Sequence, residues 1–390
     1  HLHFFPLYNI ITLVINMKTI GLVAEYNPFH NGHLYQINKI KELYPDSTII
    51  VVMSPTITQR GELSLINKWN KTKICLDNNI DIVVELPSIF AMQSADIFAK
   101  GAITILNKLN IDILVFGTEE KDLSKLKEVA NLQKKDAFHK EVKKYLDTGY
   151  NYPTSLSKVI KNTLGYTITS PNDLLAVSYL KYLNSNITPL NIQRTTSYNG
   201  TDIKDNITSA TNLRTMLKKN IPIHTFIPNY NQNNINKIDG QTIYNYLKYN
   251  IITNSNSLNK YVDVTEGLEN RIIKYIQTSQ TKDELITNIK TKRYTYNRIS
   301  RMLSHILLSL TKDMTNNINV DYIRILGFTL QGQKHIKTLK KNIDIPLITG
   351  YKKNTSKILD YELKISSIYS LITNDNILPQ EYNKKPIIKK

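Results

Sequence analysis

The chain contains a single cysteine, Cys75, among its 390 residues. One thiol excludes an intrachain disulfide, and no second cysteine or histidine stands near it at the spacing of a metal-ligand pair. We therefore expect Cys75 to be a buried packing residue. A chain without disulfides also fits a reducing compartment, so the expected location is the cytoplasm.

Long hydrophobic runs are also missing. No segment approaches the roughly 18 uncharged apolar residues of a membrane span, so no membrane partner is expected. Residues 1–16 hold an apolar stretch but no preceding basic residue and no small-residue cleavage site, unlike a secretory signal. We expect them to be a leader or upstream extension outside the fold, because Met17 precedes a lysine and an apolar strand.

Acidic residues are outnumbered by basic ones, but only in one part of the chain. The formal net charge is +18, from 50 lysines and arginines against 32 aspartates and glutamates. Residues 1–120 hold 9 basic and 11 acidic residues, which leaves 41 basic and 21 acidic residues for 121–390. This asymmetry predicts a small-molecule site in the first part and a polyanionic partner, nucleic acid, for the second. The alternative is a solvated basic surface.

Apolar, β-branched runs recur at the spacing of βαβ units, at residues 19–26, 47–53, 81–86 and 112–117. Helical patterns separate them, as at 34–44 and 94–109. Because the runs are continuously apolar rather than alternating, they predict a parallel sheet with helices on both faces. The expected fold class is therefore α/β with a doubly wound parallel sheet. A helix at 169–183, a strand at 190–195 and a helix within 207–220 would extend it.

The first strand leads directly into "YNPFHNGH" (26–33), which places His30 and His33 at a strand-to-helix turn. At this spacing both rings can converge on one phosphate, and the free N–H groups of the helix start add a positive field. Two alternatives remain open at this point. The pair could hold a metal with Glu25 as a third ligand, or the two rings could simply pack.

A second phosphate-binding pattern lies at "ITSATNLR" (207–214). Ser209 is a candidate helix cap, and the hydroxyl-rich helix start would bring N–H groups and Arg214 to further phosphates. Alone this pattern is weak. Combined with the histidine pair on a doubly wound sheet, it resembles the nucleotidyltransferase superfamily.

Further segments narrow the resemblance to the bacterial tRNA(Met) cytidine acetate ligase family. The segments are "GLVAEYNPFHNGHLYQ" (21–36), "QRGE" (59–62), "DIVVELP" (81–87), "QSADIFAKGA" (93–102), "FGTEE" (116–120), "SPNDLLAVSYLK" (170–181) and "KRYTYNRISRMLSHILL" (292–308). The resemblance implies a nucleotidyltransferase-like Rossmann fold and a ligase that activates acetate with ATP as acetyl-adenylate. Its acceptor would be N4 of the wobble cytidine of elongator tRNA(Met), and Mg²⁺ would be carried by the nucleotide.

The resemblance also implies site residues. His30, His33 and Arg214 would be catalytic, and no residue would be a dedicated metal ligand. The implied ATP-binding residues are Val23, Ala24, Glu25, Tyr26, Asn27, Pro28, Phe29, His30, Asn31, Gly32, His33, Leu34, Tyr35, Gln36, Gly117, Asn172, Arg194 and Ser209. The chain departs from the family at Pro55, Thr56 and Ile57, where a Gly-Asn-aromatic run is expected, in a loop that could contact acetate or tRNA.

The segment at 290–310 is the predicted RNA-binding element. A helix there would carry Lys290, Arg293, Asn297 and Arg301 on one face and Met302, Leu303, Ile306 and Leu310 on an apolar stripe. Tyr294 and Tyr296 could stack on unpaired bases. Lys290, Arg293, Tyr294 and Arg301 are the residues expected to bind tRNA. The alternative is an ordinary amphipathic helix with a solvated basic side.

These patterns divide the chain into an ATP-binding domain (17–220), an Asn-rich linker or insertion (221–259) and a basic, mainly helical C-terminal region that binds tRNA (260–390). The sequence makes no prediction of oligomeric state. The main alternative function is a small-molecule adenylyl- or cytidylyltransferase of the same fold, which would not need the large basic extension. A non-catalytic RNA-binding protein is disfavoured because both phosphate-binding segments are intact.

Overall fold

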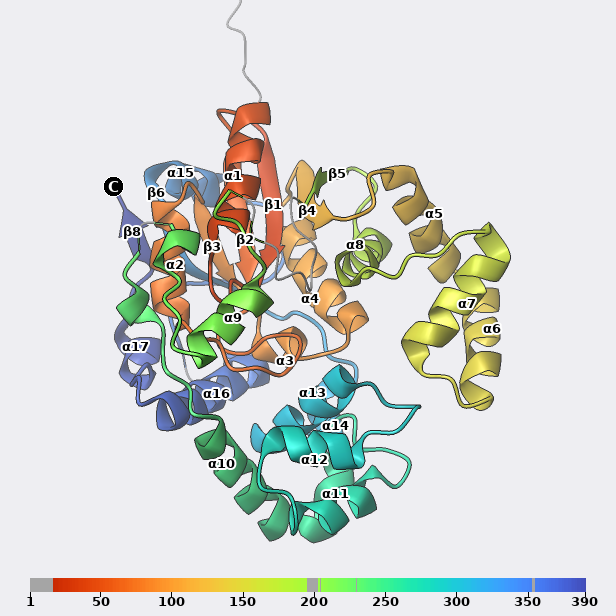
Figure 1. Cartoon of the computed structure of the whole chain (residues 1–390). Coiled ribbons are helices and arrows are strands. Elements are labelled where there is room, and N and C mark those ends of the chain that lie inside the picture. Colours follow the sequence, from red (N-terminus) through yellow and green to blue (C-terminus); the bar gives the residue numbers. More distant parts are fainter. Residues whose placement is uncertain (1–16, 195–202, 204, 229, 353–354) are drawn as a thin grey trace, which may run out of the picture.

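A computed structural model describes residues 17–194, 203, 205–228, 230–352 and 355–390. The expected leader, residues 1–16, lies outside the described residues. A twisted sheet stands at the centre of the molecule, with helices on both faces (Figure 1). Its strands are β1 (Thr19–Ala24), β2 (Thr48–Met53), β3 (Ile82–Glu85), β4 (Ile113–Thr118), β5 (Thr188–Gln193), β6 (Ile323–Thr329), β7 (Leu347–Ile348) and β8 (Ile387–Lys389).

The strand order confirms the doubly wound α/β fold. The path is β5-β4-β1-β2-β3-β6-β7, with β8 also paired to β6. Strands β1 to β5 are joined by parallel pairs, as their continuously apolar sequences predicted. The strand order reverses at β1: the chain continues to β2 and β3 on one side of β1 and to β4 and β5 on the other. In open sheets of this kind, ligands bind beyond the carboxyl ends of the strands near that point.

Two apolar layers cover the sheet. On β2, Ile49 and Val51 belong to the layer under α1 (Asn31–Leu43) and α2 (Lys68–Asp77), which also buries Cys75 as expected. Ile50 and Val52 face the opposite layer, because successive strand side chains point to opposite sides. The helices of that layer include α3 (Ser88–Ala91), α4 (Ala95–Lys108), α5 (Leu123–Gln133) and α8 (Pro171–Tyr182).

Helices outside these layers form two further groups. An antiparallel pair, α6 (Asp136–Asp147) and α7 (Tyr152–Leu164), projects beyond α5 (Figure 1). A second group lies away from the sheet and consists of α10 (Gly240–Thr253), α11 (Leu268–Ile276), α12 (Lys282–Ile289), α13 (Tyr296–Leu307) and α14 (Lys312–Thr315). Helix α9 (Ala210–Lys218) lies between the sheet and this group in the view of Figure 1.

The predicted domain limits differ from the structure in the second half of the chain. Residues 240–253, expected to belong to a linker or insertion, form α10, whose buried Tyr244, Leu247 and Ile251 join the core of the helical group. The region 260–390 is also not one unit. Its second half returns to the sheet, where β6 pairs antiparallel with β3. The physical reason is that β3 would otherwise leave an unpaired edge, which β6 covers.

The returning segment also supplies α15 (Leu330–Leu339), α16 (Lys357–Thr373) and α17 (Leu378–Asn383). It meets the sheet through a fully buried charge cluster. Lys68 Nζ lies 2.5 Å from Glu85 and 2.8 Å from Glu381, and Arg324 lies 3.2 Å from Glu85 and 2.8 Å from Glu381. Within the described residues, no helix combines the length and apolar character needed to cross a bilayer.

Candidate active site

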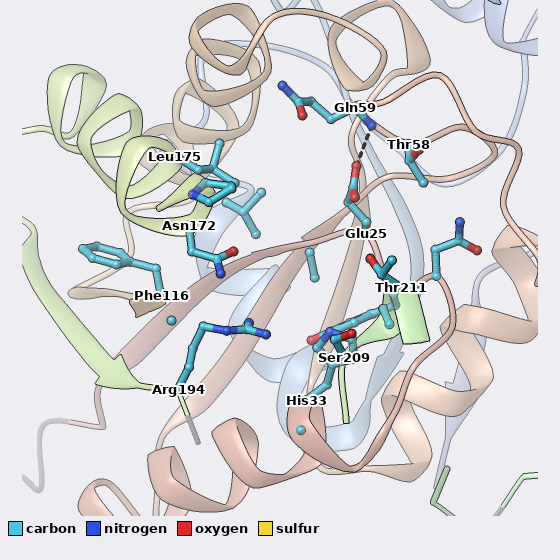
Figure 2. A pocket seen from close by; sticks show the side chains of 18 of the residues that line it. Glu25, His33, Thr58, Gln59, Phe116, Asn172, Leu175, Arg194, Ser209 and Thr211 are labelled. Atoms are coloured by element: carbon cyan, nitrogen blue, oxygen red, sulfur yellow. Dashed lines mark hydrogen bonds between the residues drawn. The ribbon is translucent and has the colours of Figure 1, made fainter. Parts of the chain in front are cut away.

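A pocket of 530 Å³ opens at the carboxyl ends of β1, β4 and β5. Its walls come from the turn after β1, the start of α1, the end of β4 and the starts of α8 and α9. Figure 2 shows Asn172 and Arg194 on one side of the pocket, and His33, Ser209 and Thr211 close together on another. The two segments predicted to bind phosphate, 26–33 and 207–214, therefore meet in one cavity although they are far apart in sequence.

The histidine pair is held by the backbone of its own turn. His30 is the N-cap of α1, and its Nδ1 accepts a hydrogen bond from Gly32 N–H at 3.0 Å. His33 Nδ1 accepts from the His30 N–H at 3.2 Å, which completes a capping box. The two rings stack with centroids 3.7 Å apart. Because each Nδ1 is an acceptor, the neutral ring carries its proton on Nε2, the nitrogen that can donate to a ligand.

Both histidines are electrically neutral near pH 7. Burial, with the nearby Arg194 and Arg214, lowers the pKa of His30 to about 3. Burial and the neighbouring His30 lower the pKa of His33 well below its usual value. The pair therefore offers neutral N–H donors, and the positive charge of the pocket comes from its arginines.

Arg214 joins the two phosphate-binding segments. Its guanidinium donates to the Asn27 carbonyl at 3.0 Å and to Thr211 Oγ1 at 3.2 Å, and its Nε lies 3.3 Å from Glu62. Ser209 caps α9 as predicted, since its Oγ accepts from Asn212 N–H at 3.1 Å. The buried Asn27 Nδ2 has no hydrogen-bond partner in the described part of the chain, which leaves a donor for a ligand.

Glu119 organises the opposite wall. It accepts hydrogen bonds from Ser170 Oγ and from Asn172 Nδ2, the latter at 2.8 Å, and Arg194 Nε lies 3.5 Å from it. Gly117 lies beneath Arg194, because a Cβ at this position would come within 3.4 Å of the Arg194 side chain. One carboxylate thus fixes the orientation of two of the predicted ATP-binding side chains.

The remaining wall is the segment 58–62. Gln59 N–H donates to Glu25 Oε1 at 2.5 Å, the contact drawn as a dashed line in Figure 2. Burial raises the pKa of Glu25. The buried Lys71 donates to the backbone carbonyls of Glu25 and Ser54, the residues that directly follow β1 and β2. Burial lowers the pKa of Lys71 to about 7. The carboxyl ends of both strands are thereby tied together.

Most residues implied as ATP-binding line this pocket, together with all three expected catalytic residues. Four do not. Phe29 and Leu34 pack in the apolar layer under α1, and Asn31 donates instead to the carbonyls of Asn206 and Thr225. Pro28 follows a cis peptide bond and turns the chain between Asn27 and Phe29. The departure at Pro55, Thr56 and Ile57 also lies outside the pocket, because these residues are buried behind the segment 58–62.

Several wall residues were missing from the sequence prediction. Glu119, Phe116, Thr58, Gln59, Arg60, Glu62 and Thr211 all belong to the site or its immediate support. The position of Glu119 could have been predicted from the sequence. It directly follows β4, and the carboxyl ends of parallel strands meet at the edge of the sheet where ligands bind. The segment 58–62 contains "QRGE" (59–62), which is part of the family resemblance, but that pattern does not place the loop at the pocket, because a loop that crosses the sheet can lie anywhere along its rim.

For the metal alternative at Glu25, one carboxylate oxygen, Oε1, already accepts a hydrogen bond from the Gln59 N–H. Across the described ranges, no group of three or more His, Cys, Asp or Glu side chains is arranged to hold a metal ion.

The predicted RNA-binding face is corrected by the structure. Helix α13 begins at Tyr296, so Lys290 and Arg293 lie before it: Lys290 caps the end of α12, and Arg293 lies in a tight turn closed by a bridge between Thr291 and Tyr294. These two basic residues are exposed and do not share a helical face with Arg301. The apolar stripe of the helix is buried as expected.

Two of the expected RNA contacts are engaged inside the protein. Tyr294 is 6% exposed, donates its hydroxyl hydrogen to Glu266, and has Arg298 4.7 Å above its ring. It therefore offers no free face to a base. The Arg301 side chain is 11% exposed and lies 3.3 Å from Asp263.

Comparison with known proteins identifies the family of the chain. Residues 17–385 match the family described as HIGH Nucleotidyl Transferase. The tRNA(Met) cytidine acetate ligase of Fusobacterium nucleatum subsp. nucleatum is 38% identical over 397 residues, covering 96% of this chain and 99% of that protein. The protein of the same name from Clostridium tetani is 33% identical over 406 residues, covering 96% and 100%.

Solved structures of Thermotoga maritima TmcAL share the fold over 95% of this chain and 99% of theirs, at 26% sequence identity. The TM-score is 0.86 for the apo form and 0.84 for the form bound with alpha-thio ATP. The histidine pair and its pocket thus occur in a chain that is similar to these proteins along nearly its whole length. The chain belongs to the HIGH nucleotidyl transferase family and, within it, to the tRNA(Met) cytidine acetate ligases.

Proposed function

We propose that this protein activates acetate with ATP and transfers the acetyl group to N4 of the wobble cytidine of elongator tRNA(Met). The observation that carries the proposal is the convergence of His30, His33, Arg194 and Arg214 on one pocket at the switch point of the sheet. The names of the full-length relatives support the same reaction.

The first step joins acetate to the nucleotide. A carboxylate oxygen of acetate attacks the α-phosphorus of ATP, and the bond to the β-phosphate oxygen breaks, so that acetyl-adenylate forms and pyrophosphate leaves. Negative charge spreads over the phosphate oxygens in such a transition state. The Nε2–H groups of His30 and His33 and the Arg214 guanidinium are the donors for that charge. Magnesium would be carried by the triphosphate, and two carboxylates of the site already accept hydrogen bonds, Glu119 from Asn172 and Glu25 from the Gln59 N–H.

The second step transfers the acetyl group. The cytidine N4 attacks the acetyl carbonyl carbon, the bond to the AMP oxygen breaks, and N4 loses a proton. The RNA is attracted by the basic part of the chain, where the exposed Lys290 and Arg293 are the proposed backbone contacts. Arg293 also lies 3.1 Å from Glu266, so an RNA phosphate would compete with this carboxylate, whereas Tyr294 and Arg301 pair with Glu266 and Asp263 and are not proposed to contact the RNA. A cytoplasmic location follows from this substrate.

The direct test combines the protein with ATP, labelled acetate and bulk tRNA, followed by digestion of the RNA to nucleosides. Labelled N4-acetylcytidine is the expected product, and omission of ATP should abolish it. AMP transfer to a small acceptor, with no label in RNA, would instead indicate a small-molecule nucleotidyltransferase.

A further inference from the structure

A second cavity of 1250 Å³ adjoins the nucleotide pocket on the far side of the segment 58–62. It lies between α9, the start of α10, the start of α12 and helix α13. The cavity exceeds the roughly 300 to 1,000 Å³ of a typical small-molecule site. Its size and its place between the sheet and the helical group suit a segment of a larger ligand.

The two cavities meet at a shared rim. Residues that line both are Arg60, Glu62, Thr211, Arg214 and Asn297. Arg214 is the residue that also contacts the turn of the histidine pair, through Asn27. A group that enters the second cavity can therefore approach the reacting end of a nucleotide in the first cavity without displacing that nucleotide.

Contacts from two helices of the helical group, α12 and α13, hold the shared rim in place. Ser304 Oγ on α13 donates to the Gly61 carbonyl at 2.6 Å, and Lys282 Nζ on α12 lies 3.2 Å from the same Ser304 Oγ. Gly61 has φ of 76°, and a Cβ there would come within 2.9 Å of the Arg301 backbone. The rim that the two cavities share is thus a built feature, in which the segment 58–62 packs directly against α13.

The walls of the second cavity suit a nucleic acid. Five basic side chains line it against three acidic ones. Each acid already has partners: Glu62 pairs with Arg214, Asp239 caps α10, and Asp283 accepts from the Tyr296 hydroxyl at 2.5 Å. Tyr296 is 42% exposed, so its ring, fixed by that hydrogen bond, is available for stacking on a base. Lys218 and Lys237 are exposed and form no ion pair within the described chain.

We propose that the second cavity receives the acceptor nucleobase, with single-stranded RNA along its basic wall and the exocyclic amine of the base directed to the shared rim. The inference rests on the proposed function and adds the site of the RNA substrate. It places the amine that attacks the acetyl carbon on the Arg60–Glu62 side of the nucleotide, and AMP departs from the other pocket.

The test fills the cavity without touching the nucleotide pocket. Thr215 lines only the second cavity, on the exposed side of α9, so Thr215→Trp adds bulk there at little risk to folding. The readouts are acetate-dependent exchange of pyrophosphate into ATP without RNA, and acetylation of tRNA. We expect exchange to stay within twofold of wild type and kcat/KM for tRNA to fall at least tenfold. Thr215→Ser is the matched control and should retain both.

A second variant needs no added bulk. Tyr296→Ala should lower tRNA acetylation at least fivefold, whereas Tyr296→Phe keeps the ring and should retain most of it. Acetate-dependent exchange of pyrophosphate into ATP again reports on the nucleotide pocket.

The outcomes separate this inference from the proposed function. If the wild type shows no acetate-dependent exchange and no acetylation, the proposed function fails. If the wild type shows both and Thr215→Trp still acetylates tRNA normally, the function stands and the acceptor site lies elsewhere. Equal loss of exchange and acetylation in Thr215→Trp would also overturn the inference, because the cavity would then belong to the nucleotide site.

Discussion

His30 is both the cap of α1 and a wall of the pocket, so its two ring nitrogens can serve the fold and a ligand separately. Nδ1 accepts from the backbone, and Nε2 is the nitrogen that can donate to a ligand. The same division holds for His33, whose Nδ1 accepts from His30 N–H. Substitutions that mimic one nitrogen or the other can therefore separate structural from catalytic effects.

His33→Ala should reduce acetate-dependent pyrophosphate exchange by roughly 10²-fold, since one preorganised donor to a developing charge contributes about 3 kcal/mol. His33→Gln, whose amide nitrogen lies near the position of Nε2, should recover part of the rate, and His33→Asn should recover less. His139→Ala, on the exposed side of α6, is the control. A folded His33→Ala protein with full exchange activity would show that the ring does not contact the reacting phosphate.

The lowered pKa of His30 also predicts a pH dependence of stability. The folded chain keeps this ring neutral down to pH of about 3, whereas the unfolded chain takes up a proton below its usual pKa of about 6.5. Below pH 6.5 the unfolded state therefore binds more protons, and the free energy of unfolding falls as the pH falls towards 3.

His30→Asn keeps the cap acceptor and removes this titration. Denaturant unfolding between pH 7 and pH 4 should show a shallower loss of stability for the variant, by up to about 1.4 kcal/mol per pH unit. Parallel curves for variant and wild type would mean that His30 titrates normally in the folded chain.

Among the elements, β1 to β5 were predictable from their apolar runs. Helices α1, α4, α8 and α9 were predictable from helical patterns, and α9 also from a local start signal, Ser209. The antiparallel β6 and the long α16 were not. Their sequences show apolar residues, but nothing local indicates that β6 returns to β3 or that α16 packs against α3. The same limit applies to the site: the histidine turn has a local pattern, whereas the segment 58–62 is placed by contacts with α13, which no short window contains.

Gly61 tests the contact between these elements. Gly61→Ala should lower the melting temperature and weaken ATP binding, because the new methyl group meets the Arg301 backbone in addition to the strain of positive φ. Gly165→Ala is a matched control, since Gly165 has φ of 80° but no neighbouring atom within 4 Å of an added Cβ. Equal shifts in melting temperature for the two variants would contradict the close packing of segment 58–62 on α13.

At the scale of the whole molecule, the buried charge cluster joins parts of the chain that are far apart in sequence. Lys68 on α2 and Glu85 on β3 meet Arg324 on β6 and Glu381 on α17. Such a cluster is strongly destabilised when one partner is removed, because the remaining charges stay buried without compensation.

Glu381→Gln should therefore reduce the free energy of unfolding by about 3 to 5 kcal/mol in urea titrations. Glu141→Gln removes a carboxylate from the exposed pair with Lys144 and should change it by less than about 1 kcal/mol. A small effect of Glu381→Gln would mean that the C-terminal helices add little to the stability of the sheet.

The position of β6 beside β3 also has a consequence for synthesis. About 240 residues separate the two strands in the chain, which a ribosome adds in roughly 10 to 50 seconds at 5 to 20 residues per second. For that time the central, strongly apolar β3 has an open edge that can pair with another chain. Nascent chains stalled before residue 320 should be cleaved by protease near β3 and retained by chaperones, whereas full-length chains resist. The order of the strands in the sheet thus makes a newly made molecule depend on protection until its last segment emerges.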